Sequence, residues 1–306
     1  MMCPICHSTD YSVLRSYRSD KAIFQQLNLA KCNVCEMVFV DPMPSKKILH
    51  EYNSSYFMTA HGGIPQDIVS QSFFSGIAGL RMRHVENYLQ KNRLKVEDIL
   101  EIGPGTGIFA KKWISNYPAN KYYAVETDTS CYPSLEQIGV NITKSSEVKD
   151  LGKQFDLVIM SHVLEHVSNP TEFISESTKL LKKDGTVFIE VPCNDWQHKS
   201  EDEPHLLFFH KKPMQQFMES MGFKNIQLSY HGQSIEELKT EKFSGGFRRV
   251  IYNALIKRNR YRLASFLYNG DPTHLNYLER AVVFPFNAHT TSTEPAWWLR
   301  VVAQKG

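Results

Sequence analysis

The sequence predicts an α/β fold built on a mostly parallel, doubly wound sheet with helices on both faces. From Asp98 onward, short apolar segments typical of strands alternate with segments of helical periodicity, and this alternation is typical of parallel sheets joined by crossover helices. The length of 306 residues suits one such domain with smaller attachments. An ordinary content of apolar and charged residues argues against a disordered or fibrous chain.

The predicted elements follow one another in a regular order. We expect strands at 98–102, 122–126, 155–160, 186–191, 223–230 and 297–303, and helices at 66–91, 108–116, 171–182 and 213–221. Ser45, after the breaker Asp41-Pro42-Met43-Pro44, can cap a short helix at 46–51. The stretch 234–293 is longer than a loop should be, so we expect a helical insertion there.

These elements divide the chain into five parts. We expect a small zinc ribbon at 1–42, a linker and helical cap at 43–93, the core at 94–233, the insertion at 234–293 and the final core strand at 294–306.

Charge and hydropathy restrict the partners. The net charge of +3 is weak for a chain of this length and indicates no nucleic-acid coat. No apolar run approaches the roughly 18 to 20 residues that a membrane span needs. The first residues enter a cysteine motif directly, without the apolar region of a signal peptide, so we expect a soluble cytoplasmic protein.

Four of the six cysteines form two Cys-x-x-Cys pairs, Cys3 with Cys6 and Cys32 with Cys35. Two such turns supply four thiolates for a closed, structural zinc site. Two disulfides, or a redox pair, are the alternatives, but a reducing compartment disfavours disulfides and a redox pair needs no second copy. Cys131 and Cys193 stand alone and are expected to be buried apolar residues.

A glycine-rich turn follows the first core strand at Gly103, Gly105 and Gly107. Missing side chains there let a ligand approach the backbone. A dinucleotide fingerprint would need glycine at position 108, which is Ile108, and a phosphate-binding loop would need a lysine, whereas none occurs before Lys111. Phosphate binding by either loop is therefore unsupported.

With Glu101, these glycines form Glu-x-Gly-x-Gly-x-Gly, which resembles class I S-adenosylmethionine-dependent methyltransferases over residues 98–191. The resemblance implies a Rossmann-like sheet with an antiparallel last strand, and S-adenosylmethionine as cofactor. Glu101 also suits a cationic sulfonium on electrostatic grounds. Glu126 ends the second strand, where an acid accepts hydrogen bonds from ribose hydroxyls in nucleoside-binding folds.

Further residues of the cofactor site follow from the same resemblance. The post-strand motif Ser161-His162-Val163-Leu164-Glu165-His166-Val167 places His162 against the cofactor, while Glu165 and His166 shape the turn. Tyr56 is expected to close over the cofactor. Family members read the adenine amine with an acid after the third strand, where this chain has Ser145-Ser146-Glu147.

The ribbon, together with Val38-Phe39-Val40-Asp41-Pro42-Met43-Pro44 and Tyr52-Asn53-Ser54-Ser55-Tyr56-Phe57, resembles bacterial methyltransferases that modify sugars and glycans. Relatives that methylate carbon carry Tyr-x-Glu-His with the histidine as base. Here His205 fits, but Pro204 and Asp202 replace the glutamate and the tyrosine. We therefore expect methylation of a hydroxyl, with His205 as the first candidate base and His231 as the second.

A basic segment lies in the insertion, with apolar residues at helical spacing. It could meet a phosphorylated or lipid-linked acceptor or an anionic membrane surface, or simply be a solvated helix. Its basic residues are Arg248, Arg249, Lys257, Arg258, Arg260 and Arg262. Three other functions compete with sugar O-methylation: RNA methylation with Arg15, Arg18 and Lys31 of the ribbon on RNA, sugar C-methylation, and a scaffold without catalysis.

Overall fold

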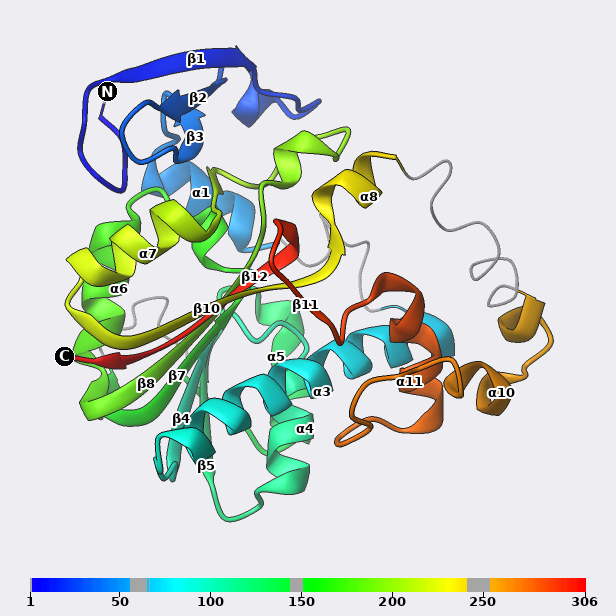
Figure 1. Ribbon diagram of the computed structural model, residues 1–306. Helices are drawn as coiled ribbons and strands as arrows, with labels where there is room; N and C mark the ends of the chain where they lie inside the picture. The colour runs from blue at the N-terminus through cyan, green and yellow to red at the C-terminus, as the bar shows by residue number, and fades with distance from the viewer. Residues whose placement is uncertain (1, 56–64, 66, 144–150, 241–253) are drawn as a thin grey trace.

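An eight-stranded sheet forms the centre of the protein in the order β11-β10-β12-β8-β7-β4-β5-β6 (Figure 1). The computed structural model describes residues 2–55, 65, 67–143, 151–240 and 254–306. Strands β6, β5, β4, β7 and β8 are parallel, whereas β12 runs antiparallel to both β8 and β10. The predicted fold class is thus confirmed. These strands are β4 (Asp98–Ile102), β5 (Lys121–Val125), β6 (Asn141–Thr143), β7 (Phe155–Ser161), β8 (Leu181–Pro192), β10 (Phe223–Ser234), β11 (Thr291–Ser292) and β12 (Ala296–Lys305).

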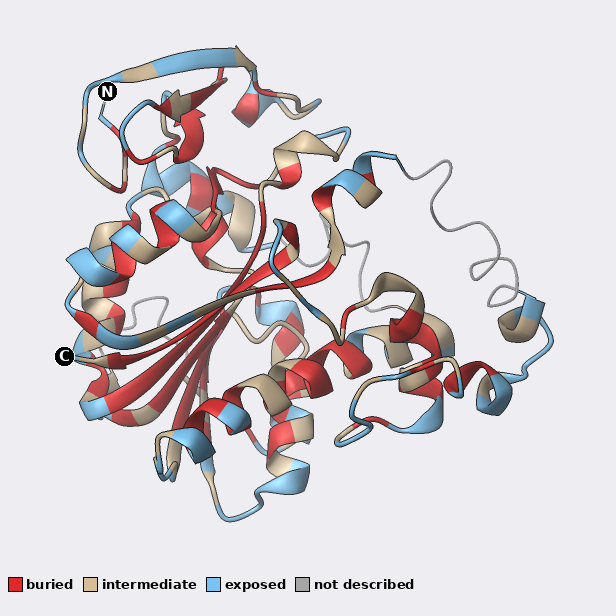
Figure 2. Ribbon diagram, viewed as in Figure 1, coloured by how far each residue is buried: buried red, intermediate tan, exposed pale blue. Residues whose placement is uncertain are grey.

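Helices cover both faces of the sheet because the strands bury apolar side chains alternately on each side. Leu100 and Val158 share one cluster with residues of α6 and α7, while Ile99 and Leu157 share another with residues of α3, α4 and α5. Figure 2 shows the resulting buried centre. These helices are α3 (Ile68–Lys91), α4 (Ile108–Asn116), α5 (Tyr132–Gln137), α6 (Pro170–Lys179) and α7 (Lys211–Ser220).

The stretch predicted as an insertion carries helices and returns to the sheet through β11. Its helices are α8 (Ile235–Lys239), α10 (Tyr261–Ser265) and α11 (Tyr277–Val283). Within it, α11 packs on the first half of α3. Lys257, Arg258, Arg260 and Arg262 are exposed, whereas Arg248 and Arg249 of the predicted basic segment lie outside the described residues. No helix in the described ranges is both long and apolar enough to cross a membrane.

The cysteine-rich N-terminus forms a second sheet in the order β1-β2-β3-β9. Strands β1 (Tyr11–Ser16), β2 (Asn28–Cys32) and β3 (Val38–Asp41) come from the ribbon, and α1 (Lys46–Asn53) follows them. The fourth strand, β9 (Leu207–Phe208), comes from the chain between β8 and α7 and pairs with β3. Sequence periodicity missed β9, because two residues are too few to show a pattern.

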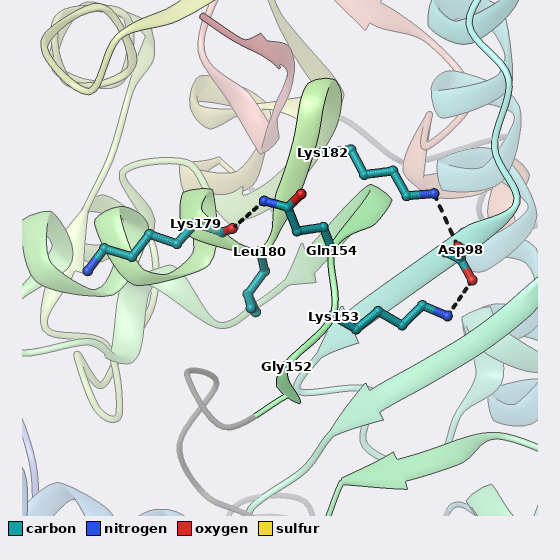
Figure 3. Close-up of a pocket in the computed structure, with 7 residues that line it drawn as sticks. All are labelled: Asp98, Gly152, Lys153, Gln154, Lys179, Leu180 and Lys182. Carbon is teal, nitrogen blue, oxygen red and sulfur yellow. Dashed lines mark hydrogen bonds and ion pairs between the residues drawn. The ribbon is translucent and has the colours of Figure 1, made fainter.

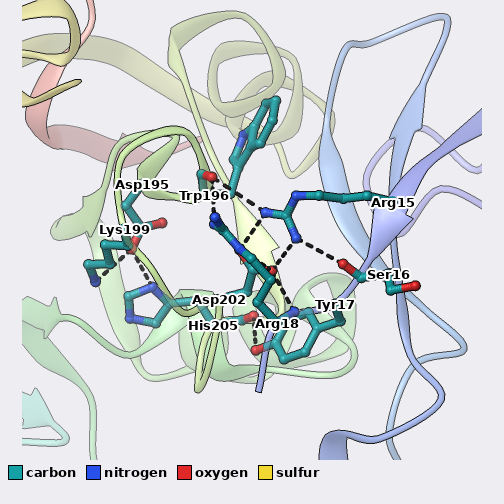
Figure 4. A network of polar contacts seen from close by, with 9 residues as sticks. All are labelled: Arg15, Ser16, Tyr17, Arg18, Asp195, Trp196, Lys199, Asp202 and His205. Atoms are coloured by element: carbon teal, nitrogen blue, oxygen red, sulfur yellow. Dashed lines mark hydrogen bonds and ion pairs between the residues drawn. The ribbon is translucent and has the colours of Figure 1, made fainter. Parts of the chain in front are cut away.

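Ion pairs fasten the ribbon to this same chain segment (Figure 4). The buried carboxylate of Asp202 accepts hydrogen bonds from the guanidinium groups of Arg15, at 2.7 Å, and Arg18, at 2.8 Å. Tyr17 donates its hydroxyl hydrogen to the backbone oxygen of His205 at 2.9 Å. The ribbon therefore holds the segment that carries His205.

We expect Asp202→Ala to lower the free energy of unfolding by about 2 kcal/mol, because both guanidinium groups, each about a third exposed, lose their buried partner. The arginines hold the pKa of Asp202 below its ordinary value against the effect of burial. This stabilisation is therefore complete above the unfolded pKa of about 3.9 and is lost as the pH falls below it.

Urea unfolding at neutral and acidic pH measures both effects. Glu176→Ala is the matched control, because Glu176 forms an exposed ion pair with Lys179 that contributes about 0.5 kcal/mol or less. An Asp202 variant as stable as the control variant at neutral pH would contradict the inferred role of Asp202.

Candidate functional site

The glycine turn joins β4 to α4 and holds left-handed backbone that glycine adopts most easily. Gly103 has φ +68, and a Cβ there would lie 2.7 Å from Cγ2 of Val163. Gly107 has φ +76 at the N-terminus of α4, and a Cβ there would lie 2.7 Å from side-chain atoms of Leu135 and Ile138. Both positions exclude a side chain, so the backbone of the turn stays open.

A cavity of about 660 Å³ opens at the carboxyl ends of β4, β5 and β7, a usual place for ligands in open parallel sheets. Its volume suits a small-molecule ligand. The predicted cofactor residues that line it are Glu101, Gly103, Gly105, Glu126 and His162.

Other predicted site residues lie elsewhere. Gly107 is not part of the cavity wall and serves the turn itself. Tyr56 and the Ser145-Ser146-Glu147 segment lie outside the described residues. Neither His205 nor His231 lines the cavity.

Glu126 closes the end of β5 over the glycine turn. Its carboxylate accepts hydrogen bonds from the backbone amides of Gly105 and Asp128, each at 2.8 Å. Burial raises the pKa of Glu126, although these amides act in the opposite direction. Each carboxylate oxygen offers more than one lone pair, so the group retains capacity for further donors.

Glu101 lies in the floor of the cavity and is fully buried. Its carboxylate accepts a hydrogen bond from the hydroxyl of Tyr122 at 2.7 Å. Burial raises the pKa of Glu101 to about 7. A cationic ligand in the cavity would favour the ionised carboxylate, because opposite charges attract strongly in a poorly solvated site.

A buried acid that sequence reasoning missed joins three elements beside the cavity. Glu190 of β8 accepts hydrogen bonds from Nε of Arg81 on α3 and from Nε of Arg300 on β12, each at 2.6 Å. Burial alone would raise the pKa of Glu190, but the two arginines hold it well below its ordinary value. Arg81 also lines the cavity. No local motif could reveal this group, because its members are far apart in sequence.

Histidines gather next to this group, around the 3-10 turn Leu164–His166. His162 and His166 both line the cavity. His162 has φ +57, and its ring contacts Glu165 at 3.2 Å and Glu190 at 3.3 Å. Burial lowers the pKa of His162, but these carboxylates outweigh burial and the net shift is upward.

His205 lies directly behind His166, with the two ring centroids 5.0 Å apart. Nδ1 of His205 is 2.7 Å from the buried carboxylate of Asp195 (Figure 4). Burial lowers the pKa of His166 to about 4, so its ring is neutral at physiological pH. His205 is therefore adjacent to the cavity through His166, without forming part of its wall.

His231 occupies a different environment. Its ring lies 5.0 Å from that of His84 and 3.5 Å from a guanidinium nitrogen of Arg300, and its Nε2 is 2.8 Å from the hydroxyl of Ser229. Burial and the charge of Arg300 lower the pKa of His231, which keeps the ring neutral. His231 is thus buried among side chains outside the cavity wall.

The four ribbon cysteines converge on one point. Their sulfur atoms all lie within 4.8 Å of one another, and the Cys3–Cys35 and Cys6–Cys32 sulfur distances are both 3.5 Å. Each Cys-x-x-Cys turn ends in a residue with left-handed backbone, His7 after the first turn and Glu36 after the second. A set of four convergent thiolates fits a tetrahedral structural metal site.

A second hollow lies at the amino-terminal edge of the sheet (Figure 3). Its acid, Asp98, accepts hydrogen bonds from the ammonium groups of Lys153 at 2.6 Å and Lys182 at 3.1 Å. Because these charges already pair with one another, we assign no function to this hollow.

The comparisons with known proteins point to one domain type. Residues 77–228 match the sequence profile of a family described as a methyltransferase domain. An uncharacterised protein of Methanocaldococcus jannaschii is 29% identical over 139 residues, which is 42% of this chain and 65% of that protein. A ubiquinone biosynthesis O-methyltransferase of Bartonella quintana is 26% identical over 112 residues, 32% of this chain and 42% of the enzyme. The chain thus spans less than two thirds of the length of either relative.

Among solved structures, the plantazolicin methyltransferase BamL, crystallised with a substrate analogue and S-adenosylhomocysteine, superposes with a TM-score of 0.50 at 15% identity. The match covers 85% of this chain and 98% of that protein, and at this identity it speaks for the fold alone. Residues 77–228, just under half of the chain, therefore match a methyltransferase-domain family, and the chain shares the α/β fold of that solved structure.

Proposed function

We propose that the protein is an S-adenosylmethionine-dependent methyltransferase that binds the cofactor in the 660 Å³ cavity. One observation carries this proposal: the carboxylate of Glu126 stands at the end of β5 and accepts a hydrogen bond from the amide of Gly105 in the open glycine turn. An acid at this place, beside a turn without lysine, fits ribose hydroxyls better than phosphates.

The chain's own residues would share the work of binding. The bare backbone at Gly103 and Gly105 admits the cofactor, Glu126 accepts its ribose hydroxyls, and Glu101 lowers the energy of a nearby cation. S-adenosylmethionine supplies a methyl group bonded to a cationic sulfur. His162, with one face in the cavity, bounds the site on the β7 side.

We place the acceptor beside His162 and His166, the histidines that line the cavity. His205, held by Asp195 through Nδ1, keeps Nε2 as a proton acceptor when its ring is neutral, and this arrangement suits a base that removes a hydroxyl proton. His231 contacts His84 and Arg300 instead of His166. We therefore propose His205, acting beside His166, in the acceptor site and assign His231 no catalytic part.

The acceptor that we propose is a hydroxyl of a sugar, nucleotide sugar or glycan. Aromatic residues from α3 and β12 line the cavity, and aromatic faces suit the apolar faces of sugar rings. These residues are Phe73, Phe74, Trp297 and Trp298. Arg81, which also lines the cavity, could contact an anionic group of such an acceptor.

The competing functions find less support. An RNA-binding ribbon would need Arg15 and Arg18, but both guanidinium groups are bound to Asp202. Carbon methylation would need a tyrosine where Asp202 forms these ion pairs. A scaffold without catalysis would need no cofactor site, and cofactor binding tests that directly.

We expect Glu126→Ala to weaken the binding of S-adenosylhomocysteine by roughly 10- to 100-fold, because a charged acceptor of hydrogen bonds is lost. Isothermal titration calorimetry measures the affinity. Glu136→Ala, on the exposed side of α5, is the matched control and should bind as the wild type does. Equal affinity in both variants would remove Glu126 from the site, and a wild type that binds no cofactor would overturn the proposed function.

We propose that the four ribbon cysteines hold one structural zinc ion. Wild-type protein passed over a mild chelating resin should retain one zinc per chain by elemental analysis, whereas Cys32→Ser should retain none and unfold more readily. Cys193→Ala is the control, because Cys193 is a buried thiol outside the ribbon. A wild type that is folded and free of zinc would contradict the assignment.

A screen of nucleotide sugars and glycans with labelled cofactor tests the acceptor. With an acceptor in hand, His205→Ala should lower the turnover rate by about 100-fold, since proton removal by a positioned group contributes on this scale, while cofactor affinity stays unchanged. His289→Ala is the control, since His289 contacts Asn269 in the insertion. An unchanged rate in His205→Ala would end the catalytic assignment.

A further inference from the structure

Three potential metal ligands converge between the cavity and the ribbon. Ligand atoms of Glu165, His166 and His205 all lie within 4.8 Å of one another. Glu165 and His166 come from the turn after β7, whereas His205 comes from the segment that the ribbon holds. A backbone hydrogen bond of 2.8 Å from Leu206 to Glu165 fastens the two segments together. The grouping therefore belongs to the fold and not to a loose surface.

In both histidines, Nδ1 lies near an oxygen atom that can accept a hydrogen bond. Nδ1 of His205 is 2.7 Å from the carboxylate of Asp195, and Nδ1 of His166 is 3.3 Å from the backbone oxygen of Pro204. Histidines that bind metals usually donate their other ring N–H to a carboxylate or a backbone carbonyl, which fixes the ring and its tautomer. In this arrangement Nε2 of each ring is the nitrogen that would face a metal ion.

The carboxylate of Glu165 lacks a full set of partners. The residue is 1% exposed, and its Oε2 has no hydrogen-bond partner among the residues that the structure describes. Its other oxygen lies 3.2 Å from His162 and 3.9 Å from Nε2 of His166. A buried carboxylate is unfavourable unless it is paired or binds a cation, and Oε2 leaves this carboxylate room for a positive partner besides His162.

We propose that Glu165, His166 and His205 bind a first-row divalent cation, distinct from the zinc of the ribbon. Two imidazole nitrogens and one carboxylate form a known ligand set for such ions and leave coordination positions open. Because His166 lines the cavity, an open position would face it. Only the use of that position rests on the proposed function: it would hold an oxygen of the acceptor and lower the pKa of its hydroxyl.

Nε2 of His205 can either bind the cation or act as the base of "Proposed function", but it cannot do both at once. With a cation bound, Nε2 of His205 is a ligand and cannot take the acceptor proton, which would then pass from the metal-bound hydroxyl to water. Metal content decides between the two roles.

Cobalt(II) tests the site in the full chain. Protein that has passed over a mild chelating resin, with its ribbon zinc in place, is titrated with Co²⁺ and followed by absorption spectroscopy and elemental analysis. We expect one Co²⁺ per chain, with visible d–d bands but without the strong charge-transfer band of cobalt thiolates. That spectrum separates the new site from exchange into the ribbon.

Variants locate the ion. Glu165→Gln and His205→Ala should lose saturable Co²⁺ binding, and Asp195→Asn should weaken it about 10-fold by releasing the ring of His205. His289→Ala, outside the cluster, should bind Co²⁺ as the wild type does. One zinc per chain and wild-type affinity for S-adenosylhomocysteine show that each variant is folded.

Two results would overturn the proposal. One is a wild type that takes up no Co²⁺ beyond the ribbon site, and the other is Co²⁺ binding that Glu165→Gln and His205→Ala leave intact. Loss of cofactor binding in the wild type would instead overturn the proposed function and leave the metal stoichiometry unaffected.

Discussion

The carboxylate of Glu190 is fully buried, and its pairing with two arginines sets the wall of the cavity. The antiparallel register of β8 and β12 places Glu190 directly opposite Arg300, while α3 brings Arg81 from the other side. Such a group is stable only when all its partners are present, because one unpaired charge in the interior is costly. This ion-pair group therefore fixes the positions of strand β12 and helix α3 relative to the parallel sheet.

The same acid also fixes the turn that follows β7. The backbone amide of His162 donates to the backbone oxygen of Glu190 at 2.8 Å, and the ring of His162 contacts the carboxylate. These contacts hold the left-handed backbone of His162, which would otherwise be unfavourable for a residue with a side chain. Arg81 and His162, which both line the cavity, are therefore linked through one ion-pair network.

Sequence reasoning succeeded where structure is local. The strand at 98–102 and the helix at 108–116 have the predicted bounds, because a buried strand, a glycine turn and an amphipathic helix each leave a short-range pattern. The hydrogen bond between Gly105 and Glu126, which follow two different strands, was not predicted. Sequence periodicity also missed α5 and β6, because both elements are too short to show a clear pattern.

Long-range pairing explains the other omissions. Glu190, Arg81 and Arg300 meet only because three distant elements pack together, and nothing within each segment marks its residue as special. The position of His205 behind His166, and the raised pKa of Glu101, likewise depend on burial that the whole fold creates. Contacts of this kind arise only when the whole chain has folded.

The strand β9 gives the ribbon a structural consequence separate from its cysteine cluster. Leu207 and Phe208 are buried and hydrogen-bonded to β3, so a protein shortened by its first forty residues would present a bare apolar edge at this place. Unprotected edges of that kind recruit strands from neighbouring molecules. By pairing with β9, the N-terminal segment protects this edge from self-association. A protein without that segment would therefore aggregate.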